Sequence, residues 1–290
     1  MKRLIVAVVL LVASSVASAF TPSPGLWYNP SESGRGFNIE IQNNTMAVAS
    51  YVYDQQGTPI WYTSAGNFNE GTETFTGAFG SAVGGQCLGC AYVRPTLSGN
   101  AGGPMHIVFT SFESGTLYFQ GGSTPIQHFN FGYNGKNDYF LGEWAFSFNI
   151  YGLISAQWIN FTGHYIGSDG TVYVQGIGDG SPSTIALGGY FASEDTFIVV
   201  VGEGTGYLTS YILKGDNSRM IGRGWLEPTG TPISGSGSAA IGSRILTPSE
   251  LSATGSADAA AYAKSAAAEP SVDVLQQLES GIQSYIRSRQ

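Results

Sequence analysis

Short runs of alternating apolar and polar residues, separated by turn residues, fill most of the chain from Trp27 onward. Such alternation is typical of strands with one buried face. In the first part of the chain these runs cover residues 26–29, 37–41, 46–53, 59–64, 74–79, 105–110, 116–120 and 126–131. Most of the connections are shorter than the roughly dozen residues that a parallel crossover needs. The strands are therefore expected to be antiparallel to their neighbours.

The same pattern restarts after residues 134–138, which have linker composition. Gly142-Glu143-Trp144 repeats the G-x-W of Gly25-Leu26-Trp27. Further runs cover residues 145–150, 154–166, 171–177, 185–191, 196–201, 207–213 and 220–226. Meanders of this kind usually remove exposed edges by closing into a barrel. We predict an all-β chain with two antiparallel, barrel-like meander modules, residues 20–135 and 138–232. The pattern leaves open whether they are two barrels or one continuous sheet system.

The composition changes after Pro232. Residues 233–270 are rich in Ser, Gly and Ala and are predicted to form a flexible linker. Residues 271–289 carry apolar residues at helical spacing on one face, namely Val272, Leu275, Leu278, Ile282 and Ile286. They predict an amphipathic C-terminal helix. This helix could dock on a barrel, self-associate with a second copy, or fray.

Residues 1–19 have the three parts of a secretory signal peptide. Lys2 and Arg3 precede an apolar run from Leu4 to Val12, and the segment closes on Ala17-Ser18-Ala19. The apolar run is shorter than the roughly 20 residues that span a bilayer, which disfavours a membrane anchor. We expect cleavage after Ala19 and an exported protein, periplasmic or extracellular.

The charge of the chain argues against a nucleic-acid partner. The net charge is −8, only 11% of residues are charged, and Arg35 and Arg94 are the only Lys or Arg residues between Phe20 and Gly135. Nucleic-acid binding requires clustered Lys and Arg, so no nucleic acid is expected. Beyond the leader, no apolar run is long enough for a transmembrane helix. The three histidines form no H-E-x-x-H pattern, so neither a metal nor a cofactor is predicted.

Cys87 and Cys90 are the only cysteines, in a glycine-rich segment with C-x-x-C spacing. A redox site would need a strand-to-helix context, and a zinc site would need further ligands. In an oxidising compartment a local disulfide is the favoured interpretation. The redox, metal and free-thiol alternatives stay open.

Two stretches carry a specific motif. Residues 25–37 read G-L-W-Y-N-P-S-E-S-G-R-G-F, and residues 53–62 read Y-D-Q-Q-G-T-P-I-W-Y. Together they resemble a module of exported proteobacterial proteins of unknown function, with the pattern G-x-W-x-x-P-x-E-S-G-x-G, then Y-D-x-x-G-x-P-x-W. The resemblance covers about residues 25–131, and Arg35 stands where a Trp is equally common. It implies no activity. The G-x-W also resembles lipocalin and avidin-like barrels, which bind small molecules in the barrel mouth.

The motif supplies the candidate ligand-binding residues Trp27, Glu32, Arg35, Trp61 and Tyr62, which would share one rim of a barrel. A competing interpretation makes Trp27 a plug that buries a large ring at one barrel end, as for Trp144. Glu32 and Arg35 could also simply pair across their turn.

These observations favour an exported, soluble β-barrel-type binding or interaction protein, and no residue pattern supports a catalytic role, although an enzyme is not excluded. Its partner would be a small molecule, a glycan or a protein. One alternative is an outer-membrane β-barrel, although most predicted strands are shorter than the roughly 9–11 residues that cross a bilayer. Another is a secreted hydrolase that uses the carboxylates of Glu32 and Asp54.

Overall fold

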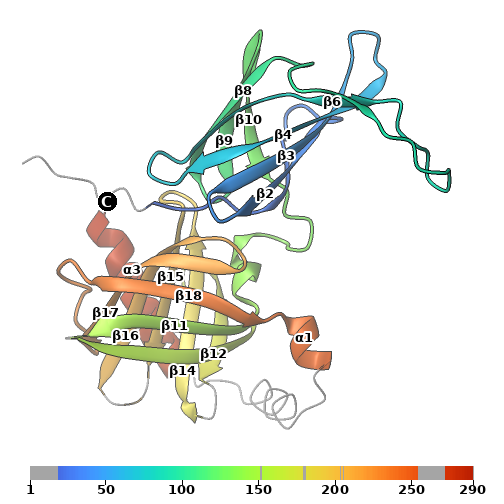
Figure 1. The fold of residues 1–290 in the computed structure, drawn as a ribbon. Helices are drawn as coiled ribbons and strands as arrows, with labels where there is room; N and C mark the ends of the chain where they lie inside the picture. The colour runs from blue at the N-terminus through green and yellow to red at the C-terminus, as the bar shows by residue number, and fades with distance from the viewer. Residues whose placement is uncertain are drawn as a thin grey trace, which may run out of the picture. The chain divides into compact units, whose positions relative to one another are not determined.

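The computed structural model describes residues 19–150, 152–178, 181–202, 204, 206–253 and 272–289. All but the last residue of the predicted signal peptide, and residues 254–270 of the predicted linker, lie outside this range. The chain divides into two compact units, Met1–Phe129 and Asn130–Gln290 (Figure 1). Among the residues that the structure describes, no helix combines the length and apolar character needed to cross a membrane.

The first unit contains a closed barrel of eight antiparallel strands. They are β1 (Gly25–Tyr28), β2 (Gly36–Gln42), β3 (Thr45–Tyr53), β4 (Pro59–Asn69), β5 (Thr74–Ala78), β8 (Pro104–Ser111), β9 (Ser114–Phe119) and β10 (Gly122–His128). The ring closes where β1 pairs with β10, with Trp27 opposite His128. The predicted antiparallel meander is confirmed for this unit, because two-residue periodicity and short turns leave neighbouring strands little choice of partner.

The inward side chains of this barrel fill it. They are Trp27, Phe37, Ile39, Met46, Val48, Phe68, Phe75, Phe79, Met105, Ile107, Phe109, Leu117 and Ile126. Trp27 is 1% exposed, and its Nε1 donates a hydrogen bond to the Ser23 carbonyl oxygen at 3.0 Å. Its ring packs edge-on against Phe109, with centroids 5.3 Å apart. Trp27 therefore belongs to the core.

Between β5 and β8 the chain leaves the barrel as a ribbon, which we call the arm (residues 81–98). Its strands β6 (Ser81–Val83) and β7 (Thr96–Ser98) pair with each other. Gly80, just before β6, exchanges two backbone hydrogen bonds of 2.8 Å with Thr63 of β4. Figure 1 shows the arm extending beyond the barrel. Strands of three residues are too short to show alternation, so the sequence predicted only a glycine-rich loop here.

The second unit contains a second closed barrel of eight antiparallel strands. They are β11 (Gly142–Ile150), β12 (Leu153–Ile166), β13 (Val172–Gly178), β14 (Ser181–Phe191), β15 (Thr196–Gly202), β16 (Tyr207–Gly215), β17 (Arg219–Pro228) and β18 (Ser238–Leu246). The two modules are thus two barrels, each with its own core. A 3-10 helix, η1 (Lys136–Phe140), precedes β11 and buries Tyr139 and Phe140 in the second core.

The predicted flexible linker over 233–270 is wrong for its first part, because β18 and a short helix, α1 (Pro248–Ala253), lie within it. The second module therefore continues past residue 232 to Leu246. The small residues that resemble a linker are required by packing. Ala240 pairs with Phe148 and Gly242 with Phe146. A Cβ at Gly242 would come within 2.8 Å of the Phe146 ring.

The C-terminal helix is present as α3 (Val272–Arg289). Of the three alternatives for it, the structure shows docking: α3 packs on β14 and β15. Leu275, Leu278 and Ile282 are buried in a cluster with outward side chains of these strands. β15 is buried on both faces, between the barrel core and α3, which explains its continuous apolar run.

Candidate functional site

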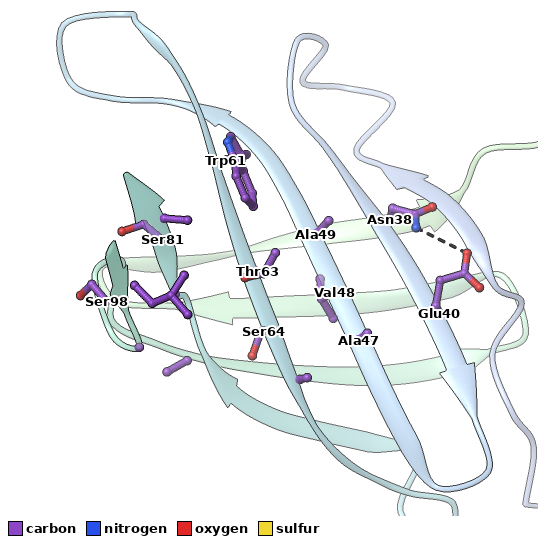
Figure 2. Close-up of a pocket in the computed structure, with 16 residues that line it drawn as sticks. Asn38, Glu40, Ala47, Val48, Ala49, Trp61, Thr63, Ser64, Ser81 and Ser98 are labelled. Atoms are coloured by element: carbon purple, nitrogen blue, oxygen red, sulfur yellow. Dashed lines mark hydrogen bonds between the residues drawn. The ribbon is translucent and has the colours of Figure 1, made fainter. Parts of the chain in front are cut away.

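A groove of about 730 Å³ lies against β2, β3 and β4 of the first barrel, beside the base of the arm (Figure 2). It lies on the outer face, because most of the lining residues on these strands point outward. Its lining residues are Asn38, Glu40, Ala47, Val48, Ala49, Trp61, Thr63, Ser64, Ala65, Ala78, Gly80, Ser81, Ala82, Leu97, Ser98 and Gly99.

The floor of the groove consists of small outward side chains. Ala47 pairs with Ala65, and Ala49 pairs with Thr63, across β3 and β4. Their strand neighbours Val48 and Ser64 point the opposite way and are buried. Because no large side chain rises from these four positions, a flat molecule can approach the sheet closely.

Trp61 stands at one end of the groove (Figure 2). It is 51% exposed and lies opposite Tyr51, which is equally exposed, on β3. An exposed indole on a rigid strand offers a flat apolar surface with a hydrogen-bond donor at its edge.

Asn38 and Glu40 line the groove from β2, the strand that pairs with β3 beside the floor (Figure 2). Asn38 pairs with Ala49 and Glu40 with Ala47. Asn38 Nδ2 donates a hydrogen bond to Glu40 Oε1 at 3.4 Å. The pair thus places an amide and a carboxylate beside an apolar floor.

The base of the arm borders the groove on a further side, with Ser81 on β6 and Leu97 and Ser98 on β7. This wall can stand close to β4 because residue 80 is a glycine. A Cβ there would come within 3.2 Å of the Ser98 carbonyl oxygen and 3.3 Å of the Thr63 carbonyl oxygen.

The structure does not bring the five predicted ligand-binding residues into one site. Trp61 lines the groove, but Tyr62, the next residue on β4, points inward and packs against Phe79 with ring centroids 5.6 Å apart. Trp27 is in the core. Strand alternation alone separates Trp61 from Tyr62.

Glu32 and Arg35 form an ion pair in the β1–β2 loop, as the pairing hypothesis predicts. Thr124 of β10 donates a hydrogen bond from Oγ1 to Glu32 Oε2 at 3.3 Å. Asn29 Nδ2 in turn donates to Thr124 Oγ1 at 2.9 Å. These contacts tie the loop to β10, so both charged residues have a structural role at this end of the barrel.

Asp54 shapes the β3–β4 turn. Its Oδ1 accepts backbone hydrogen bonds from Gln56 at 2.9 Å and from Thr58 at 2.8 Å. Such bonds stabilise turns. The contacts of Glu32 and Asp54 are thus those of loop-stabilising carboxylates, and the hydrolase alternative gains no support from them.

The histidines have local partners. Thr76 Oγ1 lies 2.9 Å from His106 Nδ1, Asp138 Oδ1 lies 2.8 Å from His164 Nε2, and the Pro24 carbonyl oxygen lies 3.0 Å from His128 Nε2. Within the described residues no three His, Cys, Asp or Glu side chains form a cluster able to hold a metal ion. Cys87 and Cys90 form a disulfide, with Cα atoms 5.1 Å apart.

Comparison of the chain with protein-family models, curated proteins and solved structures returned no significant match. The resemblance to exported proteobacterial proteins therefore stays a prediction.

Sequence reasoning found Trp61 but missed the residues that make the groove around it. Asn38, Glu40, Ala47 and Ala49 are the outward members of alternating strands, and their partners across the sheet depend on register. The sequence does carry a signal for the floor of the groove, because β3 alternates large inward residues with outward alanines at positions 47 and 49.

Proposed function

We propose that this chain is an exported binding protein that holds a neutral glycan in the groove of the first barrel. The observation that carries the proposal is the combination in one groove of the exposed Trp61, the alanine floor and the Asn38–Glu40 pair. Each part matches one feature of a sugar ring.

A sugar ring has an apolar face of C–H groups and a rim of hydroxyl groups. The C–H face suits stacking on the exposed indole of Trp61, which buries apolar surface on both partners. The hydroxyl rim suits Glu40, which accepts hydrogen bonds, and Asn38, which both donates and accepts them. The small floor of Ala47 and Ala49 gives a ring room to lie flat.

The charge of the chain favours an uncharged ligand. The net charge is −8, and Glu40 is the charged residue that lines the groove. A polyanionic glycan would meet repulsion there, whereas hydroxyl groups would not.

The barrel interiors support a water-soluble protein with an outer-face site. Both cores are filled by apolar and aromatic side chains. Outer-membrane barrels have the opposite pattern, a polar interior and an apolar outer band. The same filling disfavours a ligand deep inside the first barrel. The Cys87–Cys90 disulfide is compatible with an oxidising compartment outside the cytoplasm.

Self-association through α3 loses support, because its apolar face is already buried against the second barrel. A dimer formed through that face would first require the helix to undock.

Isothermal titration calorimetry with neutral oligosaccharides, such as gluco- and chito-oligosaccharides, tests the proposal. Trp61→Ala is expected to weaken binding about tenfold or more, the loss of a stacking contact of about 1.4 kcal/mol. The matched control is Trp158→Ala. Trp158 is 46% exposed on β12 of the second barrel and should leave binding unchanged.

Glu40→Gln should weaken binding without unfolding the protein, since Glu40 is exposed. If the wild type and Trp61→Ala bound oligosaccharide with equal affinity, the groove would not be the binding site. If the protein bound no neutral oligosaccharide but did bind an extended peptide, the proposed glycan ligand would be wrong and a peptide would be the ligand.

A further inference from the structure

The arm has an apolar tip. Five large apolar residues in this ribbon are more than half exposed, and they are Val83, Leu88, Tyr92, Val93 and Leu97. Single exposed apolar residues are common on protein surfaces. Here they share one thin ribbon, and Leu88, Tyr92 and Val93 lie in the part that does not line the groove.

The disulfide presents Leu88 at the apex of a tight turn. Cys87 and Cys90 flank Leu88 and Gly89, and the Cys90 backbone N–H donates to the Cys87 carbonyl oxygen at 3.1 Å. Gly89 has a φ of 82°, the left-handed value that the third residue of a type II turn requires. The turn is closed by both a hydrogen bond and a covalent bond, so Leu88 loses little further freedom when it binds a surface.

The arm is also free of negative charge. In a chain with 20 acidic residues, the stretch between Glu73 and Glu113 contains none, and its sole Lys or Arg is Arg94, next to Val93. The tip therefore combines apolar side chains, one aromatic ring and one cation. This set of side chains suits the boundary between lipid headgroups and acyl chains.

We propose that the tip of the arm inserts into the surface of a lipid membrane, with Leu88, Tyr92 and Val93 among the acyl chains and Arg94 at the headgroups. The shape of the arm favours lipid over a protein partner. A stable protein interface buries about 1,200 Å² or more over a broad patch. A two-stranded ribbon with a single-residue apex offers no such patch, whereas a bilayer accepts protruding side chains individually. The inference is independent of the glycan site.

Vesicle flotation tests the proposal, with vesicles of phosphatidylcholine alone and of phosphatidylcholine and phosphatidylglycerol in equal parts. The apolar run Leu4–Val12 would itself bind lipid. The comparison is therefore made between variants of the full chain, and again in the form that begins at Phe20, which retains all the described elements.

Leu88→Glu is expected to lower the partition coefficient about tenfold or more, through loss of one buried leucine. The matched control is Leu153→Glu. Leu153 is 76% exposed at the start of β12 in the second barrel and should leave flotation unchanged. Arg94→Gln should weaken binding about fivefold on anionic vesicles and leave neutral vesicles unaffected, since one cation near an anionic surface contributes about 1 kcal/mol.

The proposal would be overturned if the form that begins at Phe20, without any substitution, did not float with the vesicles. Equal flotation of the wild type and Leu88→Glu would also overturn it, and would leave the tip as a contact for a protein. Neither result would bear on oligosaccharide binding, because the groove residues are unchanged in these variants.

Discussion

The guanidinium of Arg244 lies over the indole ring of Trp144, with its central carbon 5.0 Å from the ring centroid. Trp144 belongs to the first strand of the second barrel and Arg244 to the last. Arg244 also donates hydrogen bonds to the backbone carbonyl oxygens of Tyr139, Leu141 and Asn217. One side chain thus joins β18, β11, η1 and the turn before β17.

Arg244→Ala is expected to destabilise the second barrel by about 3 kcal/mol or more, because it leaves partly buried carbonyl groups without their charged donor. Urea unfolding followed by circular dichroism measures the change. Arg223→Ala is the control: its side chain is exposed on β17 and, within the part of the chain that the structure describes, donates one hydrogen bond, to the loop carbonyl of Gly237 at 3.3 Å. Equal stability of the two variants would show that Arg244 does not hold the barrel closed.

Trp27→Ala and Trp61→Ala should separate a core residue from a surface residue. Trp27 is 1% exposed, and its loss is expected to cost about 3–5 kcal/mol of unfolding free energy. Trp61→Ala should change stability by about 0.5 kcal/mol or less, since it stands on the outer face. Denaturant unfolding of both variants measures this. A destabilised Trp61→Ala would mean that Trp61 is a packing residue and would weaken the groove proposal.

Leu278→Ala should loosen the docking of α3. Leu278 is fully buried against the second barrel, so the cavity is expected to cost about 2–5 kcal/mol. Amide hydrogen exchange in α3 should accelerate before that of the barrel strands, as for a locally unfolding unit. Gln277→Ala, an exposed neighbour, is the control. Unchanged exchange in Leu278→Ala would contradict the docked helix.

The ion pair between Lys136 and Asp195 should make a small, pH-dependent contribution to the free energy of unfolding. Their charged atoms lie 3.0 Å apart, and Tyr190 donates a hydrogen bond to the same carboxylate oxygen at 2.8 Å. Burial raises the pKa of Asp195, but the hydrogen bond and charge of Lys136 and the bond from Tyr190 outweigh it, so the pKa lies below its ordinary value. A lowered pKa stabilises the fold above the unfolded-state pKa of about 3.9, and this contribution is lost as pH falls through the folded-state pKa.

Lys136→Met should therefore reduce stability near neutral pH, and the difference from the wild type should shrink in acid. The effect should stay below about 1 kcal/mol, because 39% of the Asp195 side chain is exposed to solvent. Urea unfolding at several pH values, in a double-mutant cycle with Asp195→Asn, measures it. A difference that persists in acid would assign the loss to packing rather than charge.

Replacement of Cys87 and Cys90 by serine should leave the first barrel as stable as the wild type. The disulfide closes a turn within the arm, and no barrel strand lies between the two cysteines. A cross-link acts chiefly on the freedom of the segment it closes. Thermal unfolding of the two proteins should coincide within about 1 kcal/mol. A large loss of stability in the serine variant would show that the arm stabilises the barrel.

Local pattern was enough to predict most of the strands and the C-terminal helix, but not β6, β7, β18 or α1. Phe37, Ile39 and Ile41 identify a strand because side chains alternate faces, and the spacing of Leu275, Leu278 and Ile282 identifies a helix because its turn is 3.6 residues. Trp61 and Tyr62 were nevertheless predicted at one shared rim, whereas strand alternation puts them on opposite faces of β4. These properties depend on neighbouring residues alone.

Tertiary structure decided the rest. β18 resembles a linker because Ala240 and Gly242 are small, and only barrel closure, which brings them against Phe148 and Phe146, makes small residues the ones that fit. The groove likewise depends on the register that sets Ala47 beside Ala65. Residues far apart in sequence meet only when the chain closes. By itself the sequence therefore determined most of the strands and the C-terminal helix, and the fold decided which strand closes each barrel and where the groove lies.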